Sequence, residues 1–472
     1  MIAMTLGEIA EAVGGRLVAA AASVPVTGPV EYDSRLVAPG GLFVAFGGER
    51  VDGHDFAAAA VASGAVAVLG TREVVGDDGR GVPMIVVDDA LVALGRLARA
   101  VVDRLPRLTV IALTGSSGKT TTKDYVAQVC ARLGPTVAPP GTLNNELGHP
   151  YTVLKSTEQT RYLVLENSAR GEGHISYLCG IAPPHISVVL NVGVAHIGEF
   201  GSQDAIARAK GELVEALPDE GLAVLNADDE RVRAMASRTR ARVVLVGEAP
   251  DAEVRGTDVT LDERGRVSYT LRTPEGSAPV RLAVTGRHQL GNTLAVAAVG
   301  RELGMSVPDL ATALSELTLV STRRMDVFDR PDGVTVIDDS YNANPASTAA
   351  ALRALAGIGR GRRTIAVLGY HAELGRYERQ GHEQVGQLAA ELGVDLVIAI
   401  GEAAPIHDGA VGVASWGGKS VRVTDQQEAI ALLRGELRPG DVVLVKGSRY
   451  RTWDVVDALR PHATAAHPEA SA

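Results

Sequence analysis

From about residue 105 to residue 250 the chain carries short apolar runs that alternate with longer stretches of helical periodicity. Continuous apolar runs bounded by loops are typical of strands that are buried on both faces. Their alternation with helices is typical of a parallel sheet with crossover connections. The strands of this predicted sheet are 109–113, 162–166, 186–191, 222–226 and 242–247.

The same alternation begins again after residue 330 and predicts a separate sheet of Rossmann type. A polar, strand-like stretch at 253–285, a helix at 288–303 and a break near 317–326 lie between the two sheets. The strands predicted for the second sheet are 334–340, 364–369, 395–401 and 441–448.

The first hundred residues mix short helical patterns with strand-like runs at 41–46 and 65–70, and they end in a linker around Pro106. A domain ordinarily holds about 100–200 residues, and this chain has 472. The pattern therefore predicts an α/β protein of three domains. The predicted boundaries are 1–104, 105–320 and 321–460, with a disordered tail at 461–472.

Composition narrows the choice of function. The net charge is −10, so there is no basic excess of the kind that binds nucleic acid. Cys130 and Cys179 are too few for a disulfide framework or a zinc site, which suits the cytosol. The opening residues lack the core of a signal peptide, and no apolar run reaches about 18 residues. We expect a soluble, cytoplasmic protein, monomeric by default, that does not insert into a membrane.

The stretch TGSSGKTTT at 114–122 is a candidate phosphate-binding loop. The usual pattern has four residues between its two glycines, whereas two serines separate Gly115 from Gly118 here. The predicted strand before it and the helical stretch after it would direct backbone N–H groups at a phosphate. Lys119 would add a positive charge, and the Thr120 hydroxyl can ligate Mg²⁺. A plain glycine-rich turn is the alternative, but this context favours a nucleotide site.

Two further side chains are candidate metal ligands. Glu166 ends one predicted strand, and His196 follows another. The carboxyl ends of parallel strands meet at the edge where α/β sheets bind ligands. Either residue alone could be an ordinary loop residue, but their occurrence in the same unit as the phosphate loop favours a metal site.

Lys210 lies on the apolar face of a helix predicted at 203–217, four residues after Ile206. A lysine in that place can extend its ammonium to water, or it can stay buried with a lowered pKa. A buried neutral amine can take up CO₂ to form a carbamate, which turns a cation into a carboxylate-like metal ligand.

These features together resemble the Mur ligases, the ATP-dependent enzymes that build the peptide stem of bacterial cell-wall precursors. The most specific string is DDSYNANP at 338–345, and the segment that begins DSRLVAPGG at residue 33 resembles the family's UDP-sugar-binding domain. The resemblance spans about residues 5 to 460, with the motifs in order. Further similar strings are LNNELG (143–148), AHIGEFGS (195–202), AKGELVEALP (209–218), GRHQLGNTLAVAA (286–298) and LVKGSR (444–449).

The resemblance implies a first domain that binds the UDP-sugar, a central ATP-binding domain with a P-loop ATPase-like sheet, and a Rossmann-like third domain. The implied contacts to ATP are Gly115, Ser116, Ser117, Gly118, Lys119, Thr120, Thr121, Asn292, Arg324, Asn342 and Asn344. The implied Mg²⁺ ligands are Thr120, Glu166, His196 and carbamylated Lys210. The implied substrate contacts are Ser34, Arg35, Asp52, Gly53, His54, Asn144 and Asn145. Catalysis would depend on Lys119, His196, Lys210 and Asp339.

Within the family, the strings are similar to the branch that joins UDP-N-acetylmuramoyl-tripeptide to D-alanyl-D-alanine in peptidoglycan synthesis. The implied reaction transfers the γ-phosphate of ATP to a carboxylate, and the amine then attacks the acyl phosphate.

Three places depart from the family's usual sequence. Asn167 and Ser168 replace methionine and glycine, Gln289 replaces asparagine, and Tyr370 and His371 replace a small or acidic residue and methionine. Drift within a lineage is one explanation, and a paralogue that joins a different amine or acid in specialised metabolism is another. A third hypothesis is a kinase or ATPase regulator that only binds nucleotide, which would need neither the lysine on the helix nor the third domain.

Overall fold

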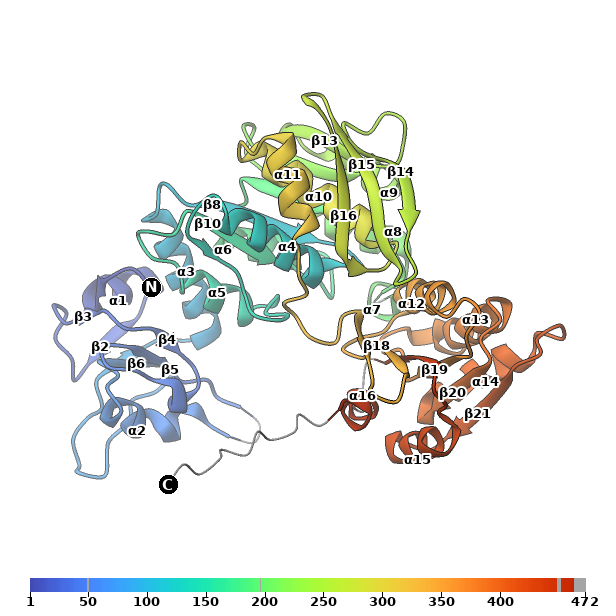
Figure 1. The fold of residues 1–472 in the computed structure, drawn as a ribbon. Helices are drawn as coiled ribbons and strands as arrows, with labels where there is room; N and C mark the ends of the chain where they lie inside the picture. The colour runs from blue at the N-terminus through green and yellow to red at the C-terminus, as the bar shows by residue number, and fades with distance from the viewer. Residues whose placement is uncertain (49–50, 196, 448–450, 462–472) are drawn as a thin grey trace, which may run out of the picture. The chain divides into compact units, whose positions relative to one another are not determined.

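The computed structural model describes residues 1–48, 51–195, 197–447 and 451–461 (Figure 1). The chain forms two compact units. The first contains residues 1–192, 207–255 and 294–310, and the second contains residues 193–206, 256–293 and the chain from 311 onward. No helix in the described ranges is long and apolar enough to cross a membrane.

The N-terminal part of the first unit is a five-stranded sheet in the order β2-β7-β6-β5-β4, in which only the β2–β7 pairing is antiparallel. Its strands are β2 (Arg16–Val18), β4 (Val30–Glu31), β5 (Leu42–Val44), β6 (Ala67–Gly70) and β7 (Met84–Val86). A small pair, β1 (Met4–Thr5) with β3 (Pro25–Val26), precedes it. The helices are α1 (Leu6–Val13), α2 (Ala57–Ala62) and α3 (Ala90–Asp103), with short 3₁₀ turns η1 (Ser34–Leu36) and η2 (Gly53–Phe56).

The central sheet has the order β16-β15-β14-β13-β12-β11-β8-β10-β9. Strand β8 (Thr109–Thr114) lies between β10 (Tyr162–Glu166) and β11 (Ile186–Val189), and both pairings are parallel. The other parallel strands are β9 (Thr136–Val137), β12 (Leu222–Asn226) and β13 (Arg242–Gly247). The polar strands are β14 (Val254–Leu261), β15 (Arg266–Thr273) and β16 (Gly276–Thr285).

Helices connect these strands as the hydrophobic pattern predicts. They are α4 (Lys119–Ala131), α5 (Gly148–Val153), α6 (His174–Ile181), α7 (Ile197–Phe200), α8 (Gln203–Glu215), α9 (Glu230–Ala234), α10 (Gln289–Glu302) and α11 (Val307–Ser315). Every residue of β10 and β11 is buried, which explains why these strands are continuous apolar runs rather than alternating ones.

The C-terminal sheet has the order β17-β18-β22-β19-β20-β21, with β17 antiparallel to β18 and the remaining pairings parallel. Separate clusters of buried apolar residues cover its two faces. This arrangement confirms the Rossmann-like prediction. The strands are β17 (Asp326–Asp329), β18 (Thr335–Asp339), β19 (Thr364–Leu368), β20 (Leu396–Ile400), β21 (Lys419–Val423) and β22 (Val442–Lys446). The helices are α12 (Pro345–Ile358), α13 (Glu378–Glu391), α14 (Ala404–Val411), α15 (Gln426–Glu436) and α16 (Trp453–Leu459).

The strands predicted for both α/β sheets agree with the structure to within about two residues at each end. The predicted tail at 461–472 lies outside the described residues except for its first position, and the exact domain boundaries stay a prediction.

One buried side chain in the first unit makes no use of its polar atoms. His149 on α5 is fully buried, and neither ring nitrogen has a hydrogen-bond partner in the described part of the chain. Helix α5 packs against α3. Burial lowers the pKa of His149 to about 3, so the folded protein keeps this imidazole neutral at pH values where an unfolded histidine binds a proton.

We expect His149→Leu to stabilise the protein by about 1–3 kcal/mol at pH 7, because two buried polar atoms without partners are removed. The unfolded chain gains a proton at His149 below its ordinary pKa of 6.5, whereas the folded chain gains it near 3. As the pH is lowered from 6.5 toward 3, His149 should therefore reduce the free energy of unfolding of the wild type by about 1.4 kcal/mol per pH unit. Urea unfolding at pH 7 and pH 5 measures both effects. Equal stabilities with equal pH dependence in the two proteins would contradict the assignment.

Candidate functional site

The phosphate loop connects β8 to α4 in the way that the sequence predicts. Gly118 precedes the first helical residue, Lys119, and has a left-handed backbone with φ of 81°, which glycine adopts at little cost. A Cβ atom on Gly115 would lie 3.0 Å from the Cβ of Leu190. The loop therefore packs closely against the chain that leaves β11.

The two residues that begin α4 carry the groups expected to meet a nucleotide. The Nζ atom of Lys119 donates a hydrogen bond of 2.9 Å to the Gly115 carbonyl oxygen, so this side chain folds back across the loop. Thr120 is buried in the first helical turn. The first backbone N–H groups of a helix have no acceptor within the helix and favour anions there.

Glu166 ends β10 next to β8, because the parallel register places it beside Leu113, two residues before the loop begins. Its side chain is almost fully buried, and Oε1 accepts a 2.7 Å hydrogen bond from Asn144. The second oxygen, Oε2, is buried and has no partner among the described residues. A buried carboxylate oxygen without a partner is costly unless a ligand satisfies it.

These residues fit a magnesium ion. Thr120 and Glu166 offer hard oxygen ligands, which Mg²⁺ prefers. No group of three or more His, Cys, Asp or Glu side chains that could hold a metal occurs in the described ranges. Mg²⁺ keeps several waters and is usually bound through one or two carboxylates and substrate phosphates, so a preformed cluster is not required. His196, the other predicted ligand, lies outside the described residues.

The structure decides between the two alternatives for Lys210. Its side chain on α8 is buried and does not extend into solvent. Burial lowers the pKa of Lys210 well below its usual value, and the positive charge of Lys119 lowers it further. A neutral amine is the form that reacts with CO₂, so the burial fulfils one condition for the predicted carbamate.

Glu212, two residues further along α8, fixes the neighbouring chain. Its carboxylate accepts hydrogen bonds from the backbone N–H groups of Gly173 (2.6 Å) and Ser176 (2.9 Å) at the start of α6. Carboxylates are favourable at this end of a helix. Glu212 was not among the predicted site residues, and nothing in the sequence near it suggested the contact.

Asn144 and Asn145, predicted to contact substrate, both make structural hydrogen bonds. Asn144 contacts Glu166, as described above, and Asn145 Oδ1 accepts from the backbone N–H of Gly148 at the start of α5 (2.9 Å). Asn144 joins the segment between β9 and α5 to the carboxyl end of β10, whereas Asn145 holds the start of α5. Their predicted role in binding substrate stays a prediction.

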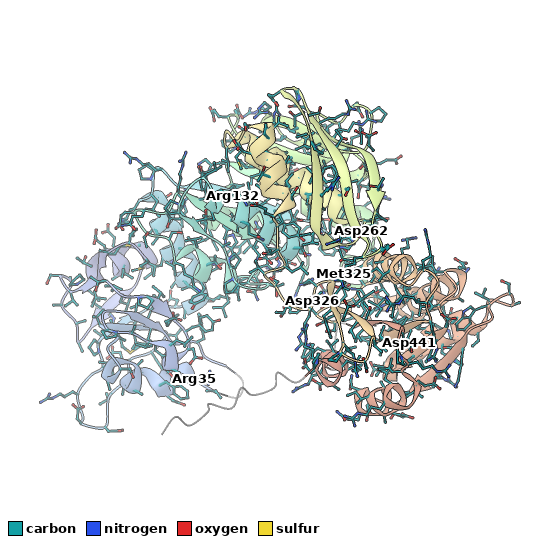
Figure 2. The ribbon with its side chains drawn as sticks, viewed as in Figure 1. Arg35, Arg132, Asp262, Met325, Asp326 and Asp441 are labelled. Carbon is teal, nitrogen blue, oxygen red and sulfur yellow. The ribbon has the colours of Figure 1, made fainter. Side chains whose placement is uncertain are left out.

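The predicted uridine-binding residues occupy two 3₁₀ turns in the N-terminal part. Arg35, which is labelled in Figure 2, pairs with Asp33 (2.6 Å), and its side chain is 85% exposed. Ser34 opens the same turn, η1. Asp52 caps η2 at its N-terminus, and its Oδ1 accepts hydrogen bonds from the backbone N–H (3.0 Å) and the Nδ1 (2.6 Å) of His54.

His54 is buried, and its Nε2 accepts from the backbone N–H of Thr71 at 2.8 Å. The imidazole therefore carries its proton on Nδ1, and both of its nitrogens have partners within the protein. A Cβ atom on Gly53 would lie 2.8 Å from the backbone nitrogen of Phe46, so this position has no room for a side chain.

In the second unit, Asp339 ends β18 and forms a buried ion pair with Lys446, which ends β22. Lys446 also donates to the carbonyl oxygen of Asn342 at 3.0 Å. Burial lowers the pKa of Lys446, and the charge of Asp339 partly opposes that effect. Asn344 caps α12 together with Ser347.

Two other predicted nucleotide contacts also lie in the second unit. The guanidinium of Arg324 lies 4.3 Å from the ring centre of Tyr341. Asn292 donates to Gln289 Oε1 (2.9 Å), so the unusual glutamine supports a predicted ligand. Lys446 itself was missed, although it stands at the end of a predicted strand.

The unusual pair Tyr370 and His371 follows β19. His371 is buried and stacks on His382 with ring centres 4.7 Å apart, and its backbone N–H donates to His382 Nε2 (3.0 Å). Burial lowers the pKa of both imidazoles. The Tyr370 hydroxyl donates to Glu378 at 2.6 Å. Both unusual side chains therefore make specific contacts within the third domain.

The most informative residue that the sequence analysis missed is Asn191, which follows β11. Its side chain accepts a hydrogen bond from the backbone N–H of Ser117 (2.9 Å) and donates one to the Ser117 carbonyl oxygen (3.1 Å). The signal was its position, at the end of a predicted strand and five residues before a predicted metal ligand.

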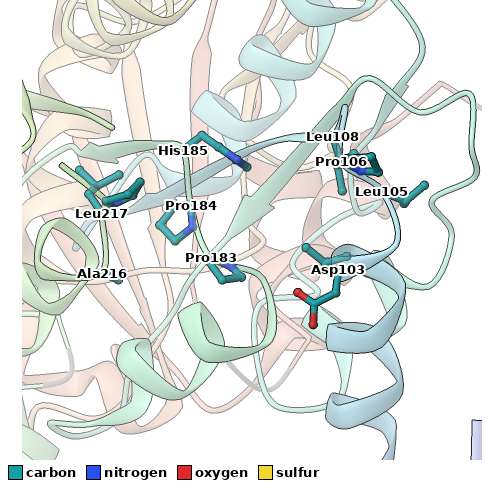
Figure 3. Close-up of a pocket in the computed structure, with 11 residues that line it drawn as sticks. Asp103, Leu105, Pro106, Leu108, Pro183, Pro184, His185, Ala216 and Leu217 are labelled. Atoms are coloured by element: carbon teal, nitrogen blue, oxygen red, sulfur yellow. The ribbon is translucent and has the colours of Figure 1, made fainter. Parts of the chain in front are cut away.

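A cavity of about 410 Å³ lies in the first unit, away from the phosphate loop (Figure 3). Figure 3 shows His185 and a set of prolines and leucines around it, among them Pro106 and Pro184. His185 precedes β11, so it lies at the amino end of that strand, whereas the phosphate loop follows the carboxyl end of β8. The lining of the cavity is mainly apolar, unlike a site for a nucleoside triphosphate.

Comparisons with known proteins agree with this geometry. Residues 29–101 match the model described as "Mur ligase family, catalytic domain", residues 113–300 the Mur ligase middle domain, and residues 323–449 the Mur ligase glutamate ligase domain. The UDP-N-acetylmuramoyl-tripeptide–D-alanyl-D-alanine ligase of Mycobacterium tuberculosis is 49% identical over 95% of this chain and 96% of its own. The Escherichia coli ligase of the same name is 35% identical over 98% of this chain and 100% of its own.

Solved structures give the same result. A MurF crystal structure from Acinetobacter baumannii superposes with a TM-score of 0.87 at 31% identity, covering 97% of this chain and 98% of that one. MurF from Thermotoga maritima in complex with ADP superposes with a TM-score of 0.79 at 30% identity, covering 92% and 97%. The domain models and the full-length similarity to these relatives show that the chain belongs to the Mur ligase family.

Proposed function

We propose that this protein joins the terminal carboxylate of UDP-N-acetylmuramoyl-tripeptide to the amine of D-alanyl-D-alanine, with conversion of ATP to ADP and phosphate. The observation that carries the proposal is the phosphate loop beside a buried, half-satisfied Glu166 carboxylate. It occurs in a chain that is similar along its whole length to ligases of that name. We further propose that the enzyme works in the cytoplasm as a monomer.

In the first step, a carboxylate oxygen of the tripeptide attacks the γ-phosphorus of ATP, and the bond to the β-phosphate oxygen breaks. Catalysis of such a transfer consists mainly of positioning and of stabilising charge on the transferred group. The backbone N–H groups that open α4 and the ammonium of Lys119 supply positive charge there. Lys119 must exchange its bond to the Gly115 carbonyl oxygen for one to a phosphate oxygen.

Thr120 and Glu166 would hold Mg²⁺, together with His196 and carbamylated Lys210. Bound Mg²⁺ neutralises negative charge on the phosphates during transfer. Because the charge of Lys119 disfavours a charged Lys210, conversion of the neutral Lys210 amine to an anionic carbamate would create an attraction between the two side chains.

In the second step, the amine of D-alanyl-D-alanine attacks the acyl carbon, and the C–O bond breaks to release phosphate. Exclusion of water from the closed site protects the acyl phosphate from hydrolysis. We propose that the residues ending β18 and β22, Asp339 and Lys446, serve this step or the closing of the third domain. A paralogue that uses a different amine would keep the first step unchanged. Full-length identity of 49% to a D-alanyl-D-alanine ligase favours D-alanyl-D-alanine as the amine.

Lys119→Ala should abolish phosphate release, because the loop loses its mobile positive charge. The assay contains ATP, Mg²⁺, UDP-N-acetylmuramoyl-tripeptide and D-alanyl-D-alanine, with wild-type enzyme as reference. Lys419→Ala, which removes an exposed lysine on β21, is the matched control and should retain wild-type turnover. A Lys119→Ala enzyme with normal turnover would refute the assignment of the loop.

Lys210→Ala should lose nearly all activity, and a short carboxylate such as acetate should restore part of it by taking the place of the carbamate. Lys119→Ala in the same buffer should not respond, because it lacks a cation rather than an anion. Turnover of both variants is measured against acetate concentration. Full activity of Lys210→Ala without acetate would exclude the carbamate.

A further inference from the structure

We propose that Asn191 is a positioning residue for the nucleotide, because its side chain holds the phosphate loop in the shape that receives phosphates. The inference rests on the proposed function only in that the loop binds ATP.

Asn191 reaches the loop because β8 and β11 are neighbours in the sheet. Their parallel register pairs Val189 with Thr114. Beyond the strands the pairing continues irregularly, with the Leu190 N–H donating to the Thr114 carbonyl oxygen (3.0 Å) and the Ser116 N–H donating to the Asn191 carbonyl oxygen (3.0 Å). The segments that follow β8 and β11 thus run side by side, and the segment after β11 carries Asn191, whose side chain contacts the phosphate loop after β8.

The side-chain amide of Asn191 satisfies both polar groups of one residue. It accepts from the Ser117 N–H at 2.9 Å and donates to the Ser117 carbonyl oxygen at 3.1 Å. Among short side chains, an amide alone presents a fixed donor and a fixed acceptor at this spacing. The contact directs the Ser117 carbonyl oxygen to Asn191, whereas a carbonyl oxygen turned toward a phosphate would repel it. The N–H groups of the following residues, which begin α4, are then the ones presented to an anion.

Asn191 is itself held from both sides. The Asn226 side chain donates to the Leu190 carbonyl oxygen (2.8 Å), and the Val192 N–H donates to Asp229 (2.8 Å). Asp229 also caps α9 through the N–H groups of Arg231 and Val232. These contacts fix the backbone on each side of Asn191, so the amide is aimed before any ligand arrives. Preorganisation of this kind lowers the cost of binding.

The test is ADP and ATP affinity, measured by calorimetry on the full chain, for Asn191→Ala and Asn191→Asp. Asn191→Ala removes both contacts. Asn191→Asp keeps the acceptor but places an anionic oxygen against the Ser117 carbonyl oxygen. Each variant should weaken nucleotide binding by about tenfold or more and raise KM for ATP by a similar factor, with little change in KM for the UDP-linked substrate.

Ser187→Ala is the matched control. Ser187 lies on the same strand, is buried, and its hydroxyl has no partner among the described residues, so its loss should leave nucleotide affinity unchanged. Should Asn191→Ala fold poorly, Asn191→Leu, which removes both contacts and keeps the size of the side chain, gives the second readout: amide hydrogen exchange at Ser117 should be faster than in wild type.

Wild-type nucleotide affinity in Asn191→Ala and Asn191→Asp, or unchanged exchange at Ser117 in Asn191→Leu, would overturn the proposal. Failure of the proposed function gives a different result, since the wild-type protein itself would then not bind ADP or ATP.

Discussion

The parallel pairing of β8 with β10 on one side and β11 on the other is the constraint on which the candidate site depends. It brings the phosphate loop, the Glu166 carboxylate and Asn191 to one edge of one sheet, although they come from three separate segments of the chain. A shift of one residue in either pairing would turn these side chains to the opposite face. All three strands are largely buried and apolar. Their packing opposes such a shift, because each side chain would then face neighbours of a different size and shape.

The site contains groups that are unfavourable for the folded protein by itself. Glu166 buries a carboxylate oxygen that no described residue satisfies, and Lys210 buries an amine whose pKa is strongly lowered. Strain and unsatisfied polar groups of this kind concentrate at functional sites, where a ligand completes the interactions. Mg²⁺ would satisfy the free oxygen of Glu166, and carbamylation would turn the Lys210 amine into an anion beside the positive charge of Lys119. The groups that would bind the ligand at this edge of the sheet therefore lower the stability of the ligand-free protein.

The sequence was sufficient for the fold class because its main signals are local. The apolar runs of β10 and β12 and the glycines of the phosphate loop can each be recognised within a few neighbouring residues. Asn191 and Glu212 could not be assigned in this way, because their partners, Ser117 and the start of α6, are distant in sequence and become neighbours only through strand pairing and helix packing. Asn144 and His54 also make hydrogen bonds within the protein that no sequence pattern indicates.

The proposed reaction depends on activation of the tripeptide carboxylate by ATP as an acyl phosphate. The most direct measurement uses UDP-N-acetylmuramoyl-tripeptide with ¹⁸O in its terminal carboxylate, ATP and D-alanyl-D-alanine, with mass analysis of the released phosphate. A carboxylate oxygen that attacks phosphorus leaves with the phosphate, so each turnover should place one ¹⁸O atom in that product. Phosphate free of ¹⁸O, released together with a ligated peptide, would contradict the account.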